Sequence, residues 1–406
     1  MSITIQKLGH LGDGIAEGPI FAAMTLPGEV VEGEVENGRI AAPRILVPSE
    51  QRVKAPCRHF KACGGCTMQH ASDTLVAGWK RDIVANALAA HGLPAPIRDV
   101  HTSPRQSRRR AVFSGRRTKR GALIGFHGRA SGTIVDLAEC HVVRPELFAL
   151  RETMAALVLL GASRKGEVSL TATLTLCGVD LAAEGLHPLD ESLRAKATAL
   201  GAEAGLARLS WNGETIAQWQ DPVLPFGKAR VAPPPGAFLQ ATAEGEAALL
   251  AAVREAVGGS ARIVDLFAGC GTFSLPLAEQ AEVLAVEGEA DMLAALDRGW
   301  RRAQGLKRVE VATRDLFRRP LLPDELSRFD AVVLDPPRAG AEAQVAELAR
   351  TDVARIAYVS CNPQSFARDA AALCAVGYQL QWIDVVDQFR WSPHVELAAA
   401  FRRPGA

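Results

Sequence analysis

The sequence predicts an α/β protein of more than one domain, whose C-terminal part is a doubly wound, mostly parallel sheet. From about residue 240 onward, short apolar runs typical of buried strands alternate with helical segments. At 406 residues the chain is also too long for one domain of the usual ~150 residues. A proline-rich stretch, 233–236, separates the C-terminal part from what precedes it.

The part before this boundary divides again. Residues 1–50 alternate short β-prone runs with glycine turns, which predicts a small β-barrel. A helix is predicted from Ser72, as its N-cap, to about Ala90. We therefore expect a β-barrel over 1–50, a central α+β domain over 51–235 and the parallel-sheet domain over 236–406.

The composition indicates a globular protein that can bury a full core, with 48% hydrophobic and 22% charged residues. The chain shows no signal peptide and no run of the ~20 apolar residues that a membrane span needs. We expect a cytoplasmic protein without a membrane partner, and a monomer.

The net charge is only +1, but the basic residues are unevenly distributed. Residues 101–120 contain eight Lys or Arg and no acid. Such a run is most often a solvated face. Other nucleic-acid signals in this chain favour a surface that binds a polyanion.

A glycine turn follows the first strand of the C-terminal part. Asp265–Phe267 ends a buried strand, and Gly269, Gly271 and Thr272 follow it. Glycines at this point allow a ligand to approach the backbone closely, as in nucleotide-binding folds. Ser274 stands where a dinucleotide fingerprint has its third glycine, which favours S-adenosylmethionine over a dinucleotide.

Two acids follow later strands of the same domain. Glu287 comes about 20 residues after the glycine turn, where a carboxylate can accept hydrogen bonds from both ribose hydroxyls. Asp315 follows the third strand and could accept a hydrogen bond from an adenine amino group. A purely structural strand–turn–helix is the alternative interpretation.

Cys361 directly follows a β-run and is a candidate nucleophile. Asn362-Pro363 breaks the strand there, and Asp335 ends the preceding strand, so both lie at the edge where open α/β sheets bind ligands. A helix beginning near Gln364 is expected to lower the pKa of the thiol. A free cysteine is otherwise most often a small buried hydrophobe.

Glu396 is a candidate base close to the C-terminus. Carbon methylation of a pyrimidine requires removal of a ring proton after methyl transfer, and a carboxylate in a partly dry pocket can remove it. His394 is the rival base.

Three cysteines, Cys57, Cys63 and Cys66, form a cluster, and Cys140 is the best candidate for a fourth ligand. In a cytoplasmic chain this pattern favours metal binding over a disulfide. Four thiolates suit zinc or a [4Fe-4S] cluster, and the uneven spacing favours the cluster. His59 and His70 are weaker candidates.

Together these motifs resemble the RNA uracil-C5 methyltransferase family, in particular its iron-sulfur 23S rRNA branch, over nearly the whole chain. The resemblance implies an OB-like TRAM domain at the N-terminus, a class I S-adenosylmethionine-dependent catalytic domain, and RNA as the partner. It assigns four cysteines to a [4Fe-4S] cluster, Cys361 to the nucleophile and Glu396 to the proton-abstracting base. The implied S-adenosylmethionine contacts are Gln240, Phe267, Glu287, Asp335 and Asp315.

The resemblance implies methylation of C5 of a uridine, most directly in 23S rRNA, through a covalent bond from Cys361 to C6. A tRNA substrate is the nearest alternative. Methylation of an exocyclic amine has no use for Cys361, and a non-catalytic iron-sulfur RNA-binding or ribosome-assembly factor has no use for Cys361 or Glu396. The chain departs from the family pattern at Thr242 and over 389–392.

Overall fold

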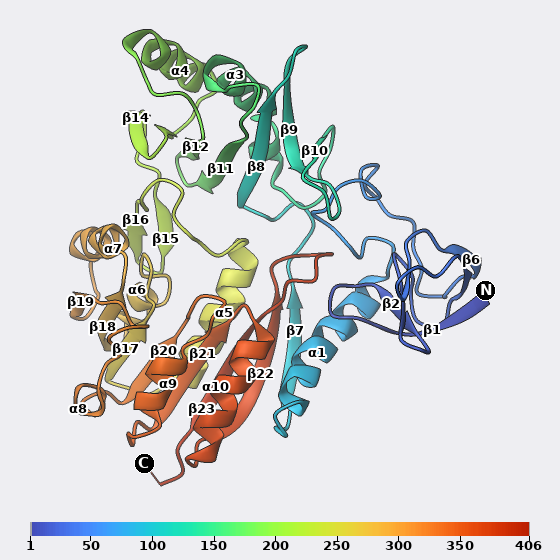
Figure 1. The fold of residues 1–406 in the computed structure, drawn as a ribbon. Helices are drawn as coiled ribbons and strands as arrows, with labels where there is room; N and C mark the ends of the chain where they lie inside the picture. Colours follow the sequence, from blue (N-terminus) through green and yellow to red (C-terminus); the bar gives the residue numbers. More distant parts are fainter. Residues whose placement is uncertain (1, 406) are drawn as a thin grey trace.

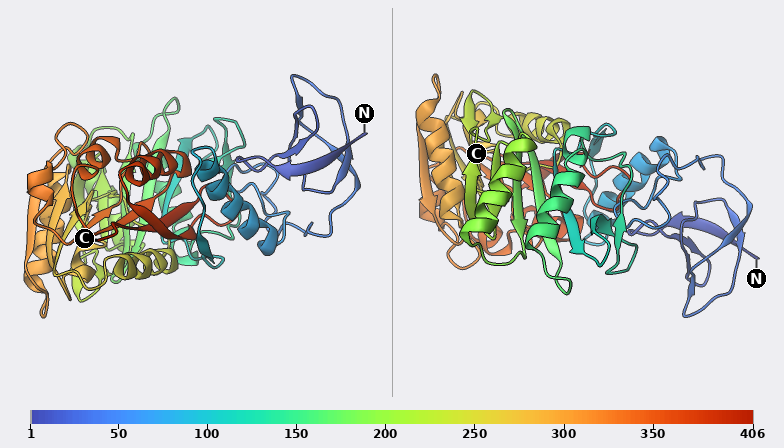
Figure 2. Two further views of the ribbon diagram at one scale, coloured as in Figure 1. Left: turned by 90° about the horizontal axis from the view of Figure 1, so that it is seen from below. Right: turned by 90° about the horizontal axis from the view of Figure 1, so that it is seen from above.

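A computed structural model of the protein describes residues 2–405 (Figure 1). Its N-terminal part is a six-stranded sheet in the order β5-β3-β2-β1-β4-β6. The strands are β1 (Ser2–Leu8), β2 (Gly14–Ala16), β3 (Ile20–Ala22), β4 (Val30–Glu32), β5 (Arg39–Ile40) and β6 (Arg44–Val47). Figure 2 shows this sheet at one end of the molecule.

The alternation of buried and exposed residues along β1 explains the small core of this sheet. Ile3 and Ile5 point to one side of β1 and are buried against Val31 and Ile40, while Thr4 between them is exposed. Within residues 2–405 the outer strands β5 and β6 do not pair with each other. Closure into a barrel therefore stays a prediction.

A seven-stranded sheet follows in the order β10-β9-β8-β11-β12-β13-β14. Helices α3 and α4 pack against each other and cover its apolar face. The elements of this region are β8 (Arg110–Arg117), β9 (Ala122–His127), β10 (Ile134–Asp136), α2 (Pro145–Phe148), α3 (Arg151–Gly161), β11 (Val168–Thr175), β12 (Gly178–Glu184), α4 (Glu191–Glu203), β13 (Arg208–Trp211), β14 (Glu214–Gln218), and the hairpin β15 (Leu224–Phe226) with β16 (Ala229–Val231).

The C-terminal part is an eight-stranded sheet in the order β19-β18-β17-β20-β21-β23-β22-β7. The strands are β7 (Ile97–Thr102), β17 (Arg262–Leu266), β18 (Glu282–Glu287), β19 (Val309–Thr313), β20 (Ala331–Leu334), β21 (Arg355–Ser360), β22 (Gln379–Asp387) and β23 (Glu396–Arg402). The helices are α1 (Asp73–Ala89), α5 (Ala243–Ala256), α6 (Ser274–Leu277), α7 (Ala290–Arg302), α8 (Pro323–Leu326), α9 (Glu342–Leu348) and α10 (Pro363–Ala375).

Strand patterning explains why this sheet is covered on both faces. In β17, Ile263 belongs to the core that contains α5 and α7, whereas its neighbour Val264 belongs to the core that contains α1, α9 and α10. Strands β19, β18, β17, β20 and β21 pair in parallel. The predicted doubly wound sheet is confirmed.

Two elements from early in the sequence join this sheet. Helix α1 packs beside α10, and β7 pairs in parallel with β22. The predicted N-cap of α1 is confirmed, because the Ser72 hydroxyl accepts a hydrogen bond from the Leu75 amide at 3.1 Å. None of the helices within residues 2–405 combines the length and apolar character that crossing a membrane requires.

The strand order reverses between β17 and β20, because β18 and β19 lie on one side of β17 and β20 and β21 on the other. In open α/β sheets, ligands bind beyond the carboxyl ends of the strands at such a reversal. This edge is therefore the expected position of a ligand site.

Candidate active site

The glycine turn after β17 has the left-handed backbone conformation that its glycines predict. The backbone turns through positive φ at Phe267 (65°), Gly269 (54°) and Gly271 (92°). A Cβ at Gly271 would lie 2.7 Å from Cγ of Leu296. Only glycine fits there, because both the conformation and the approach of α7 exclude a side chain.

Glu287, at the end of β18, is bound to this turn. Its Oε2 accepts from the Gly269 amide at 3.0 Å and its Oε1 from the Gly288 amide at 2.6 Å. A carboxylate oxygen can accept more than one hydrogen bond, so Glu287 can still receive ribose hydroxyls. Thr272 follows the turn and is half-buried.

An aromatic pair lies next to the turn. The rings of Phe267 and Phe317 are 5.5 Å apart, and Phe317 is 48% exposed. Asp315 Oδ1 accepts from the Phe317 amide at 3.0 Å and so holds the loop that presents this ring. The sequence reasoning missed Phe317; an aromatic residue two positions after Asp315 is the signal that could have found it.

Buried carboxylates gather at the strand ends. Burial raises the pKa of Asp265 to about 7, with the charge of Glu287 adding to it. Burial also raises the pKa of Asp335 well above its usual range, and Glu396, Asp265 and Glu287 raise it further. Within residues 2–405, Oδ1 of Asp265 is buried without a hydrogen-bond partner. A cationic ligand bound here would favour the ionised form of these carboxyl groups and so lower their pKa.

Cys361 lies in the loop between β21 and α10. Asn362 caps α10 by accepting from the Gln364 amide at 3.1 Å, and its Nδ2 donates to the Arg338 carbonyl at 2.8 Å. The second bond ties the cysteine loop to the segment that follows Asp335. The two strand ends are therefore held side by side.

The expectation that α10 lowers the pKa of Cys361 is wrong. Burial raises this pKa to about 11, and the carboxylates of Glu396 and Asp335 raise it further, while Arg338 opposes them. Burial of the sulfur beside acidic side chains opposes its ionisation more strongly than the nearby cation favours it. At neutral pH the group is a thiol, so forming the nucleophile requires a proton acceptor.

Glu396 is the first residue of β23 and is 3% exposed. Burial raises its pKa to about 7, and a hydrogen bond from Gln388 and the charge of Lys80 oppose the rise. A carboxyl group with this pKa can exchange a proton near neutrality. Burial also lowers the pKa of the rival His394, with Arg338 as the first of several nearby cations that add to the effect.

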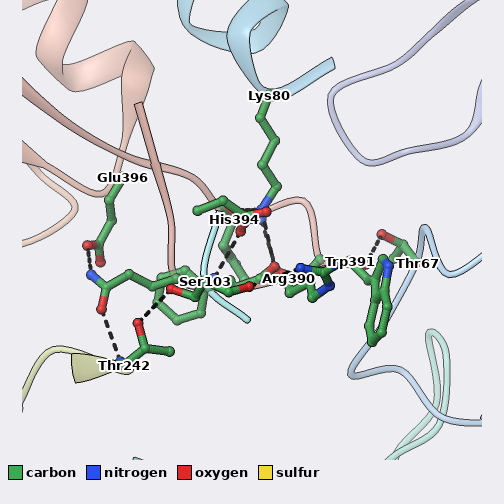
Figure 3. Close-up of polar contacts among 12 residues, drawn as sticks. Thr67, Lys80, Ser103, Thr242, Arg390, Trp391, His394 and Glu396 are labelled. Atoms are coloured by element: carbon green, nitrogen blue, oxygen red, sulfur yellow. Dashed lines mark hydrogen bonds and ion pairs between the residues drawn. The ribbon is translucent and has the colours of Figure 1, made fainter. Parts of the chain in front are cut away.

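Lys80 is a residue that the sequence reasoning missed. It reaches from α1 to the loop between β22 and β23, where its fully buried ammonium pairs with Asp387 and donates to the carbonyls of Phe389 (3.1 Å) and His394 (2.7 Å). Figure 3 shows these contacts. The available signal was a lysine at four-residue spacing with Val76 in the apolar stripe of α1.

A second set of contacts joins Gln240 and Thr242 to the base, and Figure 3 shows Glu396, Thr242 and Ser103 in this region. Gln388 donates from Nε2 to Glu396 and, at 2.6 Å, to Oε1 of Gln240. Its Oε1 accepts from the Thr242 amide at 3.2 Å. The Thr242 hydroxyl lies 2.7 Å from that of Ser103.

The predicted metal ligands lie apart from this edge but close to one another. Cys57, Cys63, Cys66 and Cys140 line one cavity of about 190 Å³. Burial raises the pKa of each, that of Cys66 to about 12, and charge on neighbouring thiols adds to each rise. All four are free of disulfides.

The four thiols line one shared cavity. Within residues 2–405, no group of three or more His, Cys, Asp or Glu is placed so that it could hold a metal ion. The predicted [4Fe-4S] cluster therefore stays a prediction. The weaker candidates, His59 and His70, are not among the residues that line the cavity.

The basic run at 101–120 is only partly available to a ligand. Arg109 pairs with Glu246, and Arg116 with Glu167. Arg110 donates to the carbonyls of Ala237 (2.8 Å) and Gly236 (3.0 Å). The exposed members are Arg105, Lys119 and Arg120.

Comparison with known proteins decides the family. A sequence model described as tRNA (Uracil-5-)-methyltransferase matches residues 310–403. The 23S rRNA (uracil(1939)-C(5))-methyltransferase RlmD of Shewanella amazonensis is 32% identical over 426 residues, which cover 99% of this chain and 95% of the relative. The chain belongs to the RNA uracil-C5 methyltransferase family.

Other members of the family are closer in sequence. An uncharacterized RNA methyltransferase of Brucella suis is 45% identical over 99% of this chain and 97% of the relative. The fold agrees with a solved Pyrococcus abyssi tRNA (uracil-54, C5)-methyltransferase in complex with S-adenosyl-L-homocysteine, at a TM-score of 0.78, 24% identity and 99% coverage of both chains. The predicted membership of this methyltransferase family is confirmed.

Proposed function

We propose that this RNA uracil-C5 methyltransferase transfers a methyl group from S-adenosylmethionine to C5 of one uridine in 23S rRNA, through a covalent bond between Cys361 and C6. The observation that carries the proposal is the placement of Cys361, Asp335 and Glu396 at one sheet edge, beside the glycine turn. The rRNA substrate rests on the 32% identity to the Shewanella enzyme.

The cofactor would bind beyond β17 and β18. Glu287 would accept the ribose hydroxyls, Asp315 the adenine amino group, and Phe267 with Phe317 would contact the adenine ring. Gln240 and Asp335 would contact the reacting end of the cofactor. A bound sulfonium group would favour the ionised forms of Asp265 and Asp335, whose pKa values burial raises, and their negative charge would then offset its positive charge. When bound, S-adenosylmethionine supplies the electrophilic methyl group.

Side chains of the protein then carry out the covalent step and the removal of the C5 proton. The target uridine is flipped out of its stack, because C6 is not reachable inside a helix. The Cys361 thiol loses its proton to water as the sulfur bonds to C6, which makes C5 nucleophilic and leaves Glu396 ionised for the later step. After C5 is methylated, Glu396 removes the C5 proton, and the C6–sulfur bond breaks to release the product.

The four cysteines would hold a [4Fe-4S] cluster, for which their shared cavity is the support. The methylation consumes no electrons, so the ligands would act by holding residues 57–66 against the loop around Cys140. The exposed basic residues Arg105, Lys119 and Arg120 and the N-terminal sheet would contact RNA phosphates. RNA affinity is then expected to fall steeply with salt.

The first experiment supplies labelled S-adenosylmethionine with unmodified 23S rRNA or tRNA, followed by nucleoside analysis. 5-Methyluridine in 23S rRNA is expected, and its absence from both RNAs would contradict the proposal. 5-Methyluridine in tRNA alone would correct the substrate and keep the reaction. Cys361→Ala is expected to abolish turnover, while Cys177→Ala, which changes an exposed thiol, is the matched control.

A second experiment separates the nucleophile from the base. Glu396→Gln should still form the C6 bond but should not remove the C5 proton, so a protein–RNA adduct should accumulate on a denaturing gel. If Glu396→Gln forms no adduct under conditions in which the wild type methylates, the assignment of the base is wrong.

A further inference from the structure

Gln388 occupies the centre of the polar network at the base. It is 1% exposed, and its partners Glu396, Gln240 and Thr242 are each at most 4% exposed. The side chain comes from the loop that follows β22, next to the buried ion pair of Asp387 with Lys80. No role was predicted for it from the sequence.

The orientation of this amide follows from its donors and acceptors. The Thr242 amide can only donate, so the group 3.2 Å from it must be the oxygen Oε1 of Gln388. Nε2 therefore faces the opposite way, and its two N–H groups go to Glu396 Oε2 and Gln240 Oε1. A flipped amide would place two acceptors against each other.

We propose that Gln388 is the positioning residue for the catalytic base: its amide holds Oε2 of Glu396, leaves Oε1 to take the C5 proton, and joins the base to the segment that carries Gln240. This inference rests on the proposed function. Within residues 2–405, Oε1 of Glu396 has no hydrogen-bond partner. A base accepts a proton from one direction when one carboxylate oxygen is held by a hydrogen bond and the other is free to accept the proton.

The same hydrogen bond also favours the ionised base. An N–H donor stabilises a carboxylate more than a carboxylic acid, and the effect is large in a dry pocket. Burial opposes ionisation of Glu396, so the donor offsets part of that opposition. Loss of the amide should therefore slow proton removal more than it slows attack by Cys361.

Hydrogen bonds between neighbouring segments explain how the Gln388 amide is held in place. The Ser103 amide donates to the Asp387 carbonyl at 2.9 Å, and the Ser103 hydroxyl meets that of Thr242 at 2.7 Å. Segments from β7, α5 and β22 thus converge on one amide. None of these contacts requires Gln388 to touch the substrate.

The test uses Gln388→Met, which keeps the length of the side chain and removes the amide. Its matched control is Gln381→Met, an exposed position on β22 whose side-chain amide donates to Gln379. Protein, S-adenosylmethionine and RNA tritiated at C5 of uridine are mixed in a single turnover. Formation of the protein–RNA adduct and release of tritium are followed from pH 6 to pH 9.

Gln388→Met should release tritium on the order of tenfold more slowly than the control at pH 7, which is the size of effect that one hydrogen bond to a charged group allows. The adduct should accumulate. Raising the pH should restore much of the rate of tritium release, because a base with a higher pKa becomes ionised only at a higher pH. A merely structural loss would slow adduct formation and tritium release together and would not respond to pH.

Release kinetics equal to those of Gln381→Met, or an equal slowing of every step at all pH values, would overturn the role of Gln388 while leaving the reaction intact. Absence of any adduct from both the wild type and Glu396→Gln would overturn the proposed function and the role of Gln388 with it. If Gln388→Met does not fold, Gln388→Asn replaces it, because it keeps the amide but withdraws it by one methylene. The same outcomes then support or overturn the role of Gln388.

Discussion

Lys80 and Asp387 form an ion pair with both side chains fully buried, although 307 residues separate them in the sequence. The lysine comes from α1, and the aspartate ends β22, which leads into the loop before Glu396. Two backbone carbonyls of that loop accept the remaining N–H groups of the ammonium. The pair therefore connects an early helix to the catalytic loop.

Removing one charge of this pair should destabilise the protein strongly. Lys80→Met leaves Asp387 buried without its partner, which typically costs about 3–5 kcal/mol of unfolding free energy. Urea unfolding measures the loss. Lys196→Met, on the exposed face of α4, is the control and should change stability by less than about 0.5 kcal/mol. Lys80→Met combined with Asp387→Leu should recover part of the loss, and a loss no larger than that of Lys196→Met would show that the pair is dispensable.

Proton removal by Glu396 should depend on pH in one direction. Its pKa lies near 7, and only the ionised form is a base, so the rate of adduct breakdown should rise with pH up to about 7 and level off above it. Single-turnover decay of a preformed adduct isolates this step from the ionisation of Cys361. A decay rate that is independent of pH from 5 to 8 would exclude Glu396 as the base.

The same carboxyl group should influence stability. Because its pKa is raised in the folded state, folding favours the protonated form, and stability is lost as pH rises from about 4.5 to about 7. Glu396→Gln removes this loss, so its unfolding free energy relative to wild type should be higher at pH 8 than at pH 5. Urea unfolding at the two pH values tests the sign, and the reverse order would contradict the burial argument.

Cys361 should react slowly with an alkylating agent at neutral pH. Its pKa is near 11, so the thiolate fraction is small at pH 7 and grows up to about pH 11. Iodoacetamide labelling followed by peptide mass spectrometry measures this rate. The exposed Cys177 in the same protein corrects for reagent decay. A Cys361 labelling rate that levels off below pH 9 would mean that the neighbouring carboxylates do not act on it.

Gly271→Ala should abolish binding of S-adenosylmethionine. The new Cβ would collide with Leu296, and the positive φ adds strain. Gly259→Ala is the matched control, since φ there is +81° but nothing lies within 4 Å of the Cβ position. Calorimetric titration should show wild-type affinity in the control and none in Gly271→Ala. Equal affinity in both variants would place the cofactor elsewhere.

The sequence by itself determined the parts whose physics is local. Short apolar runs specified the strands of the doubly wound sheet, the glycines specified the turn after β17, and Ser72 specified the start of α1. The candidates Cys361, Asp335 and Glu396 were also predictable, because each stands beside a predicted strand end and in a motif that resembles the family's.

Only the tertiary structure decided how these groups act on one another. The pKa of Cys361 depends on Glu396 and Asp335, which reach it through the order of the strands and not through sequence neighbours. Lys80 and Gln388 could not be assigned in advance, because their partners lie in other segments and a buried polar side chain is defined by those partners. Local pattern therefore determined the elements and the candidate residues, and long-range packing determined their charges and contacts.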